Sequence, residues 1–190
     1  PKLTLSLAES GGTAVVFTTS SGRPAIDPDG VVNSASGRFA LAPAGLATIW
    51  GTNLAGGSAP ASAALPLPRQ LAGVRVLFNS VAVPLLYVSD RQINFLVPAS
   101  IDGNSAEITV EFTDAGTTDR SAPISVPVRF NDPGVFAAPS SGIAAAVVIG
   151  TAETTATRPV AGGEFLAIFG TGLGALLQSP IVTLAETARV

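Results

Sequence analysis

The sequence predicts an all-β fold, and three observations carry that prediction. Short apolar runs of strand length follow one another along the 190 residues, and the 20 glycines and 15 prolines fall mostly between them. No segment shows the period of about 3.6 residues that marks an amphipathic helix. About a dozen short strands at regular spacing are typical of β-sandwiches and not of a parallel sheet covered by helices.

The amino-terminal segment predicts a hairpin followed by a loop. Leu3, Leu5 and Leu7 alternate with polar residues, and a β-branched run covers residues 13–19. A glycine-containing turn at residues 9–12 separates these two strands. We expect residues 20–37 to form a loop centred on Asp27-Pro28-Asp29-Gly30.

The central segment holds the most regular strand patterns. Strands are expected at residues 46–50, 74–78, 81–88, 92–97, 106–112 and 124–130. Asn79-Ser80 predicts a two-residue hairpin turn, and Pro127 predicts an edge strand or a bulge. The Ala-, Pro- and Ser-rich connection at residues 55–68 is expected to contain no strand and to have only weak helical preference.

An internal repeat links the centre of the chain to its carboxy-terminal part. Three more strands are expected at residues 143–149, 164–169 and 180–184, with a linker at 151–161. Within them, residues 168–173 (Ile-Phe-Gly-Thr-Gly-Leu) echo residues 49–54 (Ile-Trp-Gly-Thr-Asn-Leu). In each copy an aromatic residue expected to pack inward precedes a glycine that permits a sharp turn. The second copy should therefore open a second sandwich, and too few residues follow it for the roughly seven strands of an immunoglobulin-type domain.

Several ordered segments carry a resemblance to a known family. They are Val32-Asn33-Ser34-Ala35-Ser36, residues 49–55, Pro66-Leu67-Pro68 with Leu71-Ala72-Gly73-Val74, residues 84–89, residues 92–98 and Asp132-Pro133-Gly134-Val135-Phe136. On these segments, residues 31–136 resemble the uncharacterised carboxy-terminal domain family first noted in Solibacter and other Acidobacteria. The pattern also looks like the IPT/TIG branch of immunoglobulin-like domains. The resemblance implies a module near the end of a large, exported, multidomain bacterial protein, and it supplies no activity and no binding residues.

The chain departs from that family in two places. Family members tend to have Asn-Gly where this chain has Asn79-Ser80, and they continue the second copy beyond the position of Val190. The domain organisation expected is a hairpin and loop at 1–30, an immunoglobulin-like domain at 31–131, and a linker with an incomplete second repeat at 132–190. The hairpin could donate strands or belong to the second sandwich. The predicted fold class is thus an immunoglobulin-like β-sandwich with additional strands of a partial second sandwich.

Composition excludes several classes of chemistry. The chain has no Cys and no His, which removes thiol nucleophiles, imidazole bases, disulfides and almost every zinc, copper or haem site. A Ser–Lys pair would need Lys2, the sole lysine, which lies in a terminus expected to be mobile. The net charge of −3 and the scattered arginines argue against nucleic acid as a partner. No apolar run reaches the roughly 18 residues of a membrane span.

Acidic residues offer three candidate sites, and all three favour a structural interpretation. Asp27-Pro28-Asp29-Gly30 could begin a Ca²⁺ loop, but it lacks a third acidic ligand and a closing Glu, so a rigid turn is favoured. Asp102-Gly103-Asn104 is expected to be an ordinary turn. Glu107 and Glu111 should share one strand face about 13 Å apart, at about 3.3 Å per residue. That exceeds the roughly 5–9.5 Å of paired catalytic carboxylates, and a solvated face is expected.

The single tryptophan and the single tyrosine offer a further candidate site. Trp50 and Tyr87 could form a platform for sugar stacking, but their apolar, strand-like surroundings favour packing in the core. Asn53 and Asn94 are expected to tie turns to neighbouring backbone. We therefore expect no catalytic residue, no cofactor site and no metal site.

The function expected from the sequence is a non-catalytic structural or adhesive module of an extracellular bacterial protein, secreted or at the cell surface. The unpartnered strands at residues 3–19 and 143–185 could pair within the chain or complete the open sheet of a neighbouring copy, which would give a filament. Partners would be other copies or neighbouring domains, met through exposed strand edges. The alternative is a carbohydrate-binding or accessory module of a larger secreted enzyme.

Overall fold

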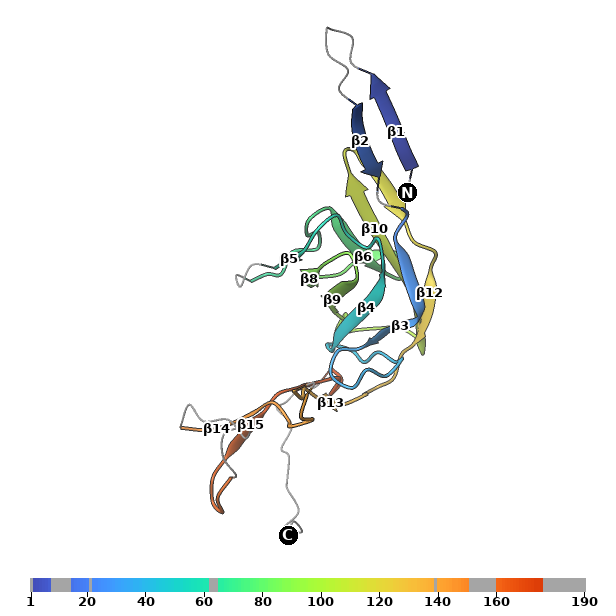
Figure 1. The fold of residues 1–190 in the computed structure, drawn as a ribbon. Coiled ribbons are helices and arrows are strands. Elements are labelled where there is room, and N and C mark those ends of the chain that lie inside the picture. Colours follow the sequence, from blue (N-terminus) through green and yellow to red (C-terminus); the bar gives the residue numbers. More distant parts are fainter. Residues whose placement is uncertain are drawn as a thin grey trace.

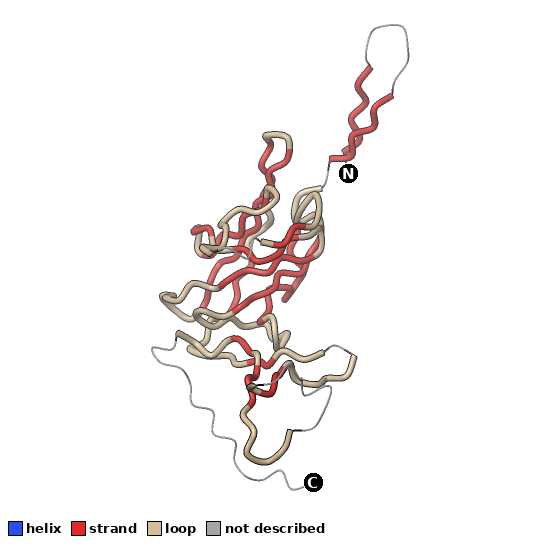
Figure 2. Tube along the Cα trace, turned by 90° about the vertical axis from the view of Figure 1, so that its left-hand side faces the viewer, coloured by secondary structure: helices blue, strands red, loops and turns tan. Residues whose placement is uncertain are grey.

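The computed structural model of the chain describes residues 2–7, 15–20, 22–61, 65–138, 140–150 and 160–175. All regular secondary structure in these segments is β-strand, which confirms the predicted all-β class. Strands β3 to β12 form a two-layered sandwich, with a hairpin beyond one end and a smaller group of strands beyond the other (Figures 1 and 2).

The first layer is an antiparallel sheet in the order β3-β4-β9-β8-β5. Its strands are β3 (Ala25–Asn33), β4 (Leu46–Thr52), β9 (Gln92–Leu96), β8 (Leu85–Val88) and β5 (Ala59–Pro60). Strand β4 lies between β3 and β9, with Ile49 opposite Val31 of β3 on one side and Ile93 of β9 on the other. This layer carries the first copy of the internal repeat.

The second layer is an antiparallel sheet in the order β11-β10-β6-β7, with β12 also paired to β10. Its strands are β11 (Thr117–Arg120), β10 (Ser105–Asp114), β6 (Val74–Phe78), β7 (Val81–Ala82) and β12 (Ile124–Pro127). The only strand with which β12 forms a ladder, among the described residues, is β10, so the edge position predicted from Pro127 is confirmed.

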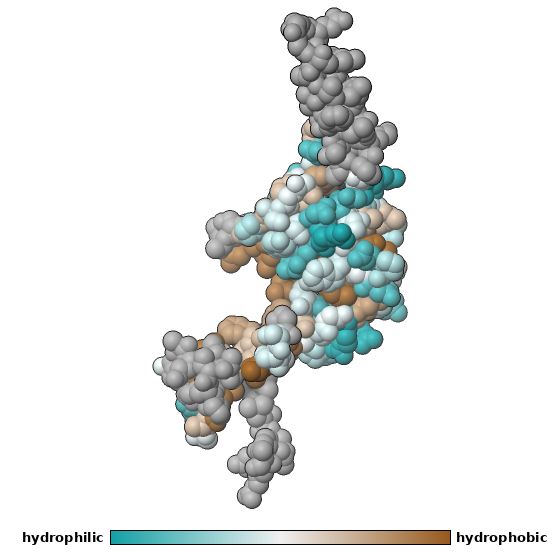
Figure 3. Space-filling model, viewed as in Figure 1, coloured by the Kyte–Doolittle hydropathy of each residue, from teal (hydrophilic) through white to brown (hydrophobic). Residues whose placement is uncertain are grey.

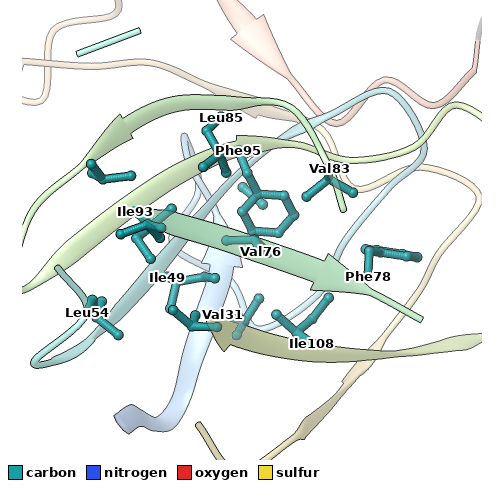
Figure 4. Close-up of a cluster of buried hydrophobic side chains, with 14 of the residues drawn as sticks. Val31, Ile49, Leu54, Val76, Phe78, Val83, Leu85, Ile93, Phe95 and Ile108 are labelled. Atoms are coloured by element: carbon teal, nitrogen blue, oxygen red, sulfur yellow. The ribbon is translucent and has the colours of Figure 1, made fainter. Parts of the chain in front are cut away.

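The core lies between the two layers and follows from alternation along the strands. Residues of β4 and β9 that point inward, Ala47, Ile49, Ile93 and Phe95, are fully buried. They meet the inward residues of β6 and β10, and Phe95 lies at the centre of the cluster in Figure 4. The inward set of the second layer is Val74, Val76, Phe78, Ala106, Ile108, Val110, Phe112 and Val126.

The amino-terminal hairpin predicted from the sequence is confirmed. Strand β1 (Lys2–Leu7) pairs antiparallel with β2 (Val15–Ser20), and the two form a sheet of their own. The register sets Leu3, Leu5 and Leu7 opposite Thr19, Phe17 and Val15. The predicted turn at residues 9–12 lies outside the described residues.

The prediction of a loop at residues 20–37 is wrong, because β3 runs from Ala25 to Asn33. Residues 27–30 form a bulge within it: Ile26 pairs with Gly51 and Val31 with Ile49, so four residues stand opposite Trp50 alone. Asp29 takes a positive φ of 53°. A Cβ at Gly30 would lie 2.7 Å from the Trp50 carbonyl oxygen, so only glycine fits. Turn-forming residues here bend a strand without ending it.

Other boundaries also differ from prediction. Strand β4 continues through Gly51 to Thr52, where a Cβ on Gly51 would lie 2.2 Å from the Ala25 carbonyl oxygen. The connection at 55–68 contains the short strand β5, and β11 at 117–120 was not predicted because its residues are all polar. The hairpin turn at Asn79-Ser80 is confirmed, and both residues take the positive φ (47° and 69°) that the tightest hairpin turns require.

The described residues from 130 to 175, here called the arm, lie beyond one end of the sandwich (Figure 1). They form two small antiparallel pairs, β13 (Gly134–Val135) with β16 (Gly170–Thr171) and β14 (Ala146–Val148) with β15 (Leu166–Ile168). The strands predicted at 143–149 and 164–169 are thus present but shorter. The predicted strand at 180–184 and most of the predicted linker at 151–161 lie outside the described residues.

Candidate interaction surfaces

Buried polar groups join the arm to the sandwich. The Asn33 side chain at the end of β3 accepts hydrogen bonds from the backbone N–H groups of Ala35 and Ser36, and its Nδ2 donates to the Asp132 carbonyl oxygen over 2.6 Å. The backbone N–H of Leu46 at the start of β4 donates to Thr171 Oγ1, also over 2.6 Å. Asn33 and Thr171 are buried, so these bonds are shielded from water and fix the arm to the rim of the first sheet.

A charge cluster closes the same junction. The Asp132 side chain is 2% exposed, and its Oδ1 lies 2.8 Å from an Arg38 guanidinium nitrogen and 3.8 Å from one of Arg129. Arg38 also donates to the Pro133 carbonyl oxygen over 3.1 Å. Asp132 Oδ2 is buried without a hydrogen-bond partner among the described residues. The carboxylate therefore depends on two arginines that are themselves more than half exposed.

The arm itself leaves apolar side chains in solvent. Nine of the twelve large apolar side chains that are exposed in the described residues belong to it, among them Phe130 (80%), Phe165 (77%) and Ile149 (60%). A shallow groove of about 410 Å³, lined by alanines, Ile143, Val147 and Phe169, adds to this surface. In Figure 3 apolar atoms gather on the concave side, where the sandwich and the arm face each other, and on the arm.

The two copies of the internal repeat differ in what covers them. Ile49 and Leu54 of the first copy are fully buried, whereas the matching Ile168 and Leu173 of the second copy are each 45% exposed. The strands differ in the same way. Strand β4 pairs on both sides, with β3 and with β9, while β15 pairs within the described residues with β14 alone. Within the described segments, the second copy thus has no counterpart of β9.

The hydrogen bonds of β15 show which of its edges has no partner strand among the described residues. The N–H of Phe169 donates to the Ala145 carbonyl, and the N–H of Ile149 donates to the Phe165 carbonyl. Residues 165 and 169 therefore turn their backbone groups toward β14. Because these groups alternate in direction along a strand, Leu166 and Ile168 turn theirs toward the open edge.

Trp50 and Tyr87 lie on the outer face of the first sheet, so the prediction that they pack in the core is wrong for Trp50, which is 44% exposed. Tyr87 is half-buried. Trp50 stands opposite Gln92 and Tyr87 opposite Asn94, and residues 92 and 94 share one face of β9. The two aromatic residues are therefore on one side of the sheet. The sequence could not show this, because β4 carries large apolar residues on both of its faces.

A row of polar side chains runs between the two aromatic residues. Gln92 Nε2 donates to Asn94 Oδ1 over 2.9 Å, and Thr48 Oγ1 donates to the same oxygen over 3.3 Å. Asn94 thus bonds to neighbouring side chains and not to a turn as predicted. The Tyr87 hydroxyl bonds to the side chains of Ser58 and Ser89, and these bonds lower the pKa of Tyr87. The other predicted asparagine, Asn53, does occupy a turn conformation, with φ of 54°.

The acidic candidates do not form a site. Asp27 and Asp29 lie in the β3 bulge, and no group of three or more acidic side chains suited to a metal occurs in the part of the chain that the structure describes. Glu107 is exposed as expected, but Glu111 is only 7% exposed, so the prediction of a solvated face is wrong there. Arg120 donates a hydrogen bond to Glu111 Oε1, and a guanidinium nitrogen of Arg75 lies 3.5 Å from Glu111 Oε2. Together the two arginines cover the carboxylate.

Of the remaining candidates, Lys2 lies at the start of β1 and Gly103 bends the predicted turn at 102–104 with φ of 87°. The described segments contain no helix that is long and apolar enough to cross a membrane.

Comparison of the chain with protein families, with characterised proteins and with solved structures finds no match in any of the three. The immunoglobulin-like assignment and the resemblance to the Solibacter-type family stay predictions, and the chain is described by its own geometry as a β-sandwich with an attached arm.

Proposed function

We propose that this chain is a non-catalytic structural module of an extracellular bacterial protein that associates head to tail by β-strand addition. Strand β1 of one copy would add to the open edge of β15 in the next. The observation that carries the proposal is the contrast between the two repeats: the first copy is covered by β9, and in the second copy no described strand pairs with the matching edge.

The exposed surface of the arm supports this association. Apolar side chains such as Phe165, Ile168 and Phe169 are between 45% and 77% exposed, and soluble monomers seldom leave so many together in water. Beside them, the edge of β15 at Leu166 and Ile168 pairs with no strand among the residues that the structure describes. An added strand would bond to that edge and cover the apolar side chains at the same time.

The amino-terminal hairpin has the pattern that the arm lacks. In the first copy, β9 supplies apolar residues at alternate positions, Ile93 and Phe95. Strand β1 repeats that alternation with Leu3, Leu5 and Leu7, and its only strand partner in the described residues is β2. Figure 1 places the hairpin and the arm at opposite ends of the sandwich, so each copy could receive one neighbour and donate to another. A head-to-tail contact of this kind need not close, and it produces filaments.

The test uses two charge substitutions that block opposite ends. Ile168→Lys places a charge at the β15 edge, and Leu5→Lys places one within β1. We expect the parent chain to grow in mass with concentration in sedimentation velocity, and each variant alone to remain monomeric. An equal mixture of the two should form dimers only, because one intact edge and one intact hairpin remain.

Val81→Lys is the matched control, because Val81 is also a strand residue that is exposed (61%) but lies on β7 of the sandwich. This variant should assemble like the parent. A parent chain that stays monomeric from micromolar to millimolar concentration would overturn the proposal, as would assembly that Val81→Lys reduces as strongly as Ile168→Lys.

A further inference from the structure

The outer face of the first sheet carries a surface that the proposed assembly does not use. It is formed by Trp50, Tyr87, Gln92 and Asn94 and is here called the aromatic face. We propose that the aromatic face binds an extended, neutral polysaccharide chain. This goes beyond assembly: it uses a different face of the molecule, and it would make the module an adhesive one with a defined class of ligand.

The spacing of the aromatic residues fits an elongated ligand. Trp50 on β4 and Tyr87 on β8 are separated by β9, and their opposite residues on β9 are two positions apart. With strands about 4.8 Å apart and a rise of about 3.3 Å per residue, their Cα atoms lie about 12 Å from each other. Two aromatic side chains at this separation can contact two different sugar rings of one polysaccharide chain. A single sugar ring is too short to contact both aromatic side chains.

The polar side chains between them complement sugar hydroxyls. The bonds within the row use Asn94 Oδ1 and Gln92 Nε2. In the described part of the chain this leaves Asn94 Nδ2 to donate and Gln92 Oε1 to accept. A sugar hydroxyl can do both, and the aromatic rings offer apolar surface to the C–H groups of the sugar. The mutual bonds of the row hold these groups in place before a ligand arrives, which lowers the entropy lost on binding.

The charge of the face selects a neutral ligand. Its four residues are uncharged. Asp90 and Arg91, which precede Gln92 in sequence, have side-chain atoms 3.8 Å apart and offset each other, whereas the exposed Asp27 and Asp29 lie in the β3 bulge opposite Trp50. These two aspartates would repel an anionic polysaccharide at the Trp50 end of the face. The 44% exposure of Trp50 also costs free energy in the unbound molecule, and a stacked sugar would recover part of it.

Because Trp50 is the only tryptophan, its fluorescence reports on the aromatic face directly. The experiment titrates the chain with cellohexaose and runs it in native gels that contain hydroxyethyl cellulose, xylan or polygalacturonate. We expect a saturable change in emission and retardation by at least one of the two neutral polymers. Trp50→Ala should weaken retardation at least about tenfold, and Asn94→Ala should weaken it severalfold.

Phe165→Ala is the matched control, since Phe165 is more exposed (77%) but lies on the arm. All variants are made in the Ile168→Lys background, so that failure to bind and failure to assemble are read separately, and circular dichroism verifies that Trp50→Ala is folded. No retardation by either neutral polymer, equal retardation of folded Trp50→Ala, stronger retardation by polygalacturonate, or loss of binding in Phe165→Ala would each overturn the proposal.

Discussion

Replacing Arg38 with alanine is expected to destabilise the protein more than replacing its partner Asp132 with asparagine. The two residues form one ion pair at 2.8 Å, but their surroundings differ sharply: the Asp132 side chain is 2% exposed and that of Arg38 is 53% exposed. The consequence of breaking the pair therefore depends on which charge is left behind.

The expected magnitudes follow from the burial of the two side chains. Arg38→Ala leaves a buried carboxylate whose remaining cation, Arg129, is 3.8 Å away. Leaving a buried charge without its partner costs about 3–5 kcal/mol, and Arg129 places this case near about 3 kcal/mol. Asp132→Asn leaves only arginines that water can solvate. The lost charge-assisted bond is worth about 1.5–3 kcal/mol, and the removed burial of the charge offsets part of it, so we expect about 1 kcal/mol.

The assay is urea unfolding at neutral pH, followed by circular dichroism and by Trp50 fluorescence, for the parent, both single variants and the double variant. Arg38→Ala leaves the Asp132 carboxylate buried without its closest cation, and Asp132→Asn removes that negative charge. The double variant should therefore be about 1–2 kcal/mol more stable than Arg38→Ala alone. A larger loss of stability for Asp132→Asn than for Arg38→Ala, or a double variant whose loss equals the sum of the two single losses, would contradict this role of the buried carboxylate.

Three further predictions test the sandwich. Gly51→Ala should cost about 3 kcal/mol or more in urea unfolding because its Cβ would lie 2.2 Å from a carbonyl oxygen, whereas Gly57→Ala, with nothing within 4 Å, should change stability by less than about 0.5 kcal/mol; equal effects would contradict the geometry. Ser80→Gly should raise stability by about 0.5–1 kcal/mol, because φ is 69° there, and an unchanged urea midpoint would show that the turn stores no strain. In an absorbance titration of the single tyrosine, the pKa of Tyr87 should be lower in the folded chain than in the urea-unfolded chain. The free energy of unfolding should therefore increase slightly as pH rises through the interval between these two pKa values. A tyrosine pKa in the folded chain that equals or exceeds the pKa in urea would exclude the two serine hydrogen bonds.

Much of the fold could be predicted because strand patterns are local. The alternation in residues 106–112 and the apolar run at 74–78 gave the positions of β10 and β6, and Asn79-Ser80 gave the turn that follows β6. The failures have a physical cause as well. Strand β11 has no apolar residue, so only its pairing with β10 defines it. The Asp27–Gly30 segment has turn-forming residues, but pairing on both sides of it keeps β3 continuous.

The candidate surfaces were harder to predict than the strands. The junction through Asn33, Asp132 and Thr171 joins residues about a hundred or more positions apart, and no local pattern marks it, although Asn33 and Asp132 belong to segments that carry the family resemblance. The aromatic face was considered from the sequence and set aside in favour of core packing. Only the register of β4, β9 and β8 places Trp50 and Tyr87 on one side of the sheet.

The sequence by itself determined the all-β class, most strand positions and the absence of His and Cys from any chemistry the chain could perform, because composition and a period of two do not depend on distant contacts. The tertiary structure decided which strand faces are covered. Alternation shows that Ile49 and Trp50 lie on opposite faces of β4, but it cannot show which face meets the second sheet. It likewise cannot show that Glu111 is covered by two arginines while Ile168, a repeat of the buried Ile49, is left exposed. Burial is a property of what packs against a residue, and those partners come from elsewhere in the chain or from another molecule.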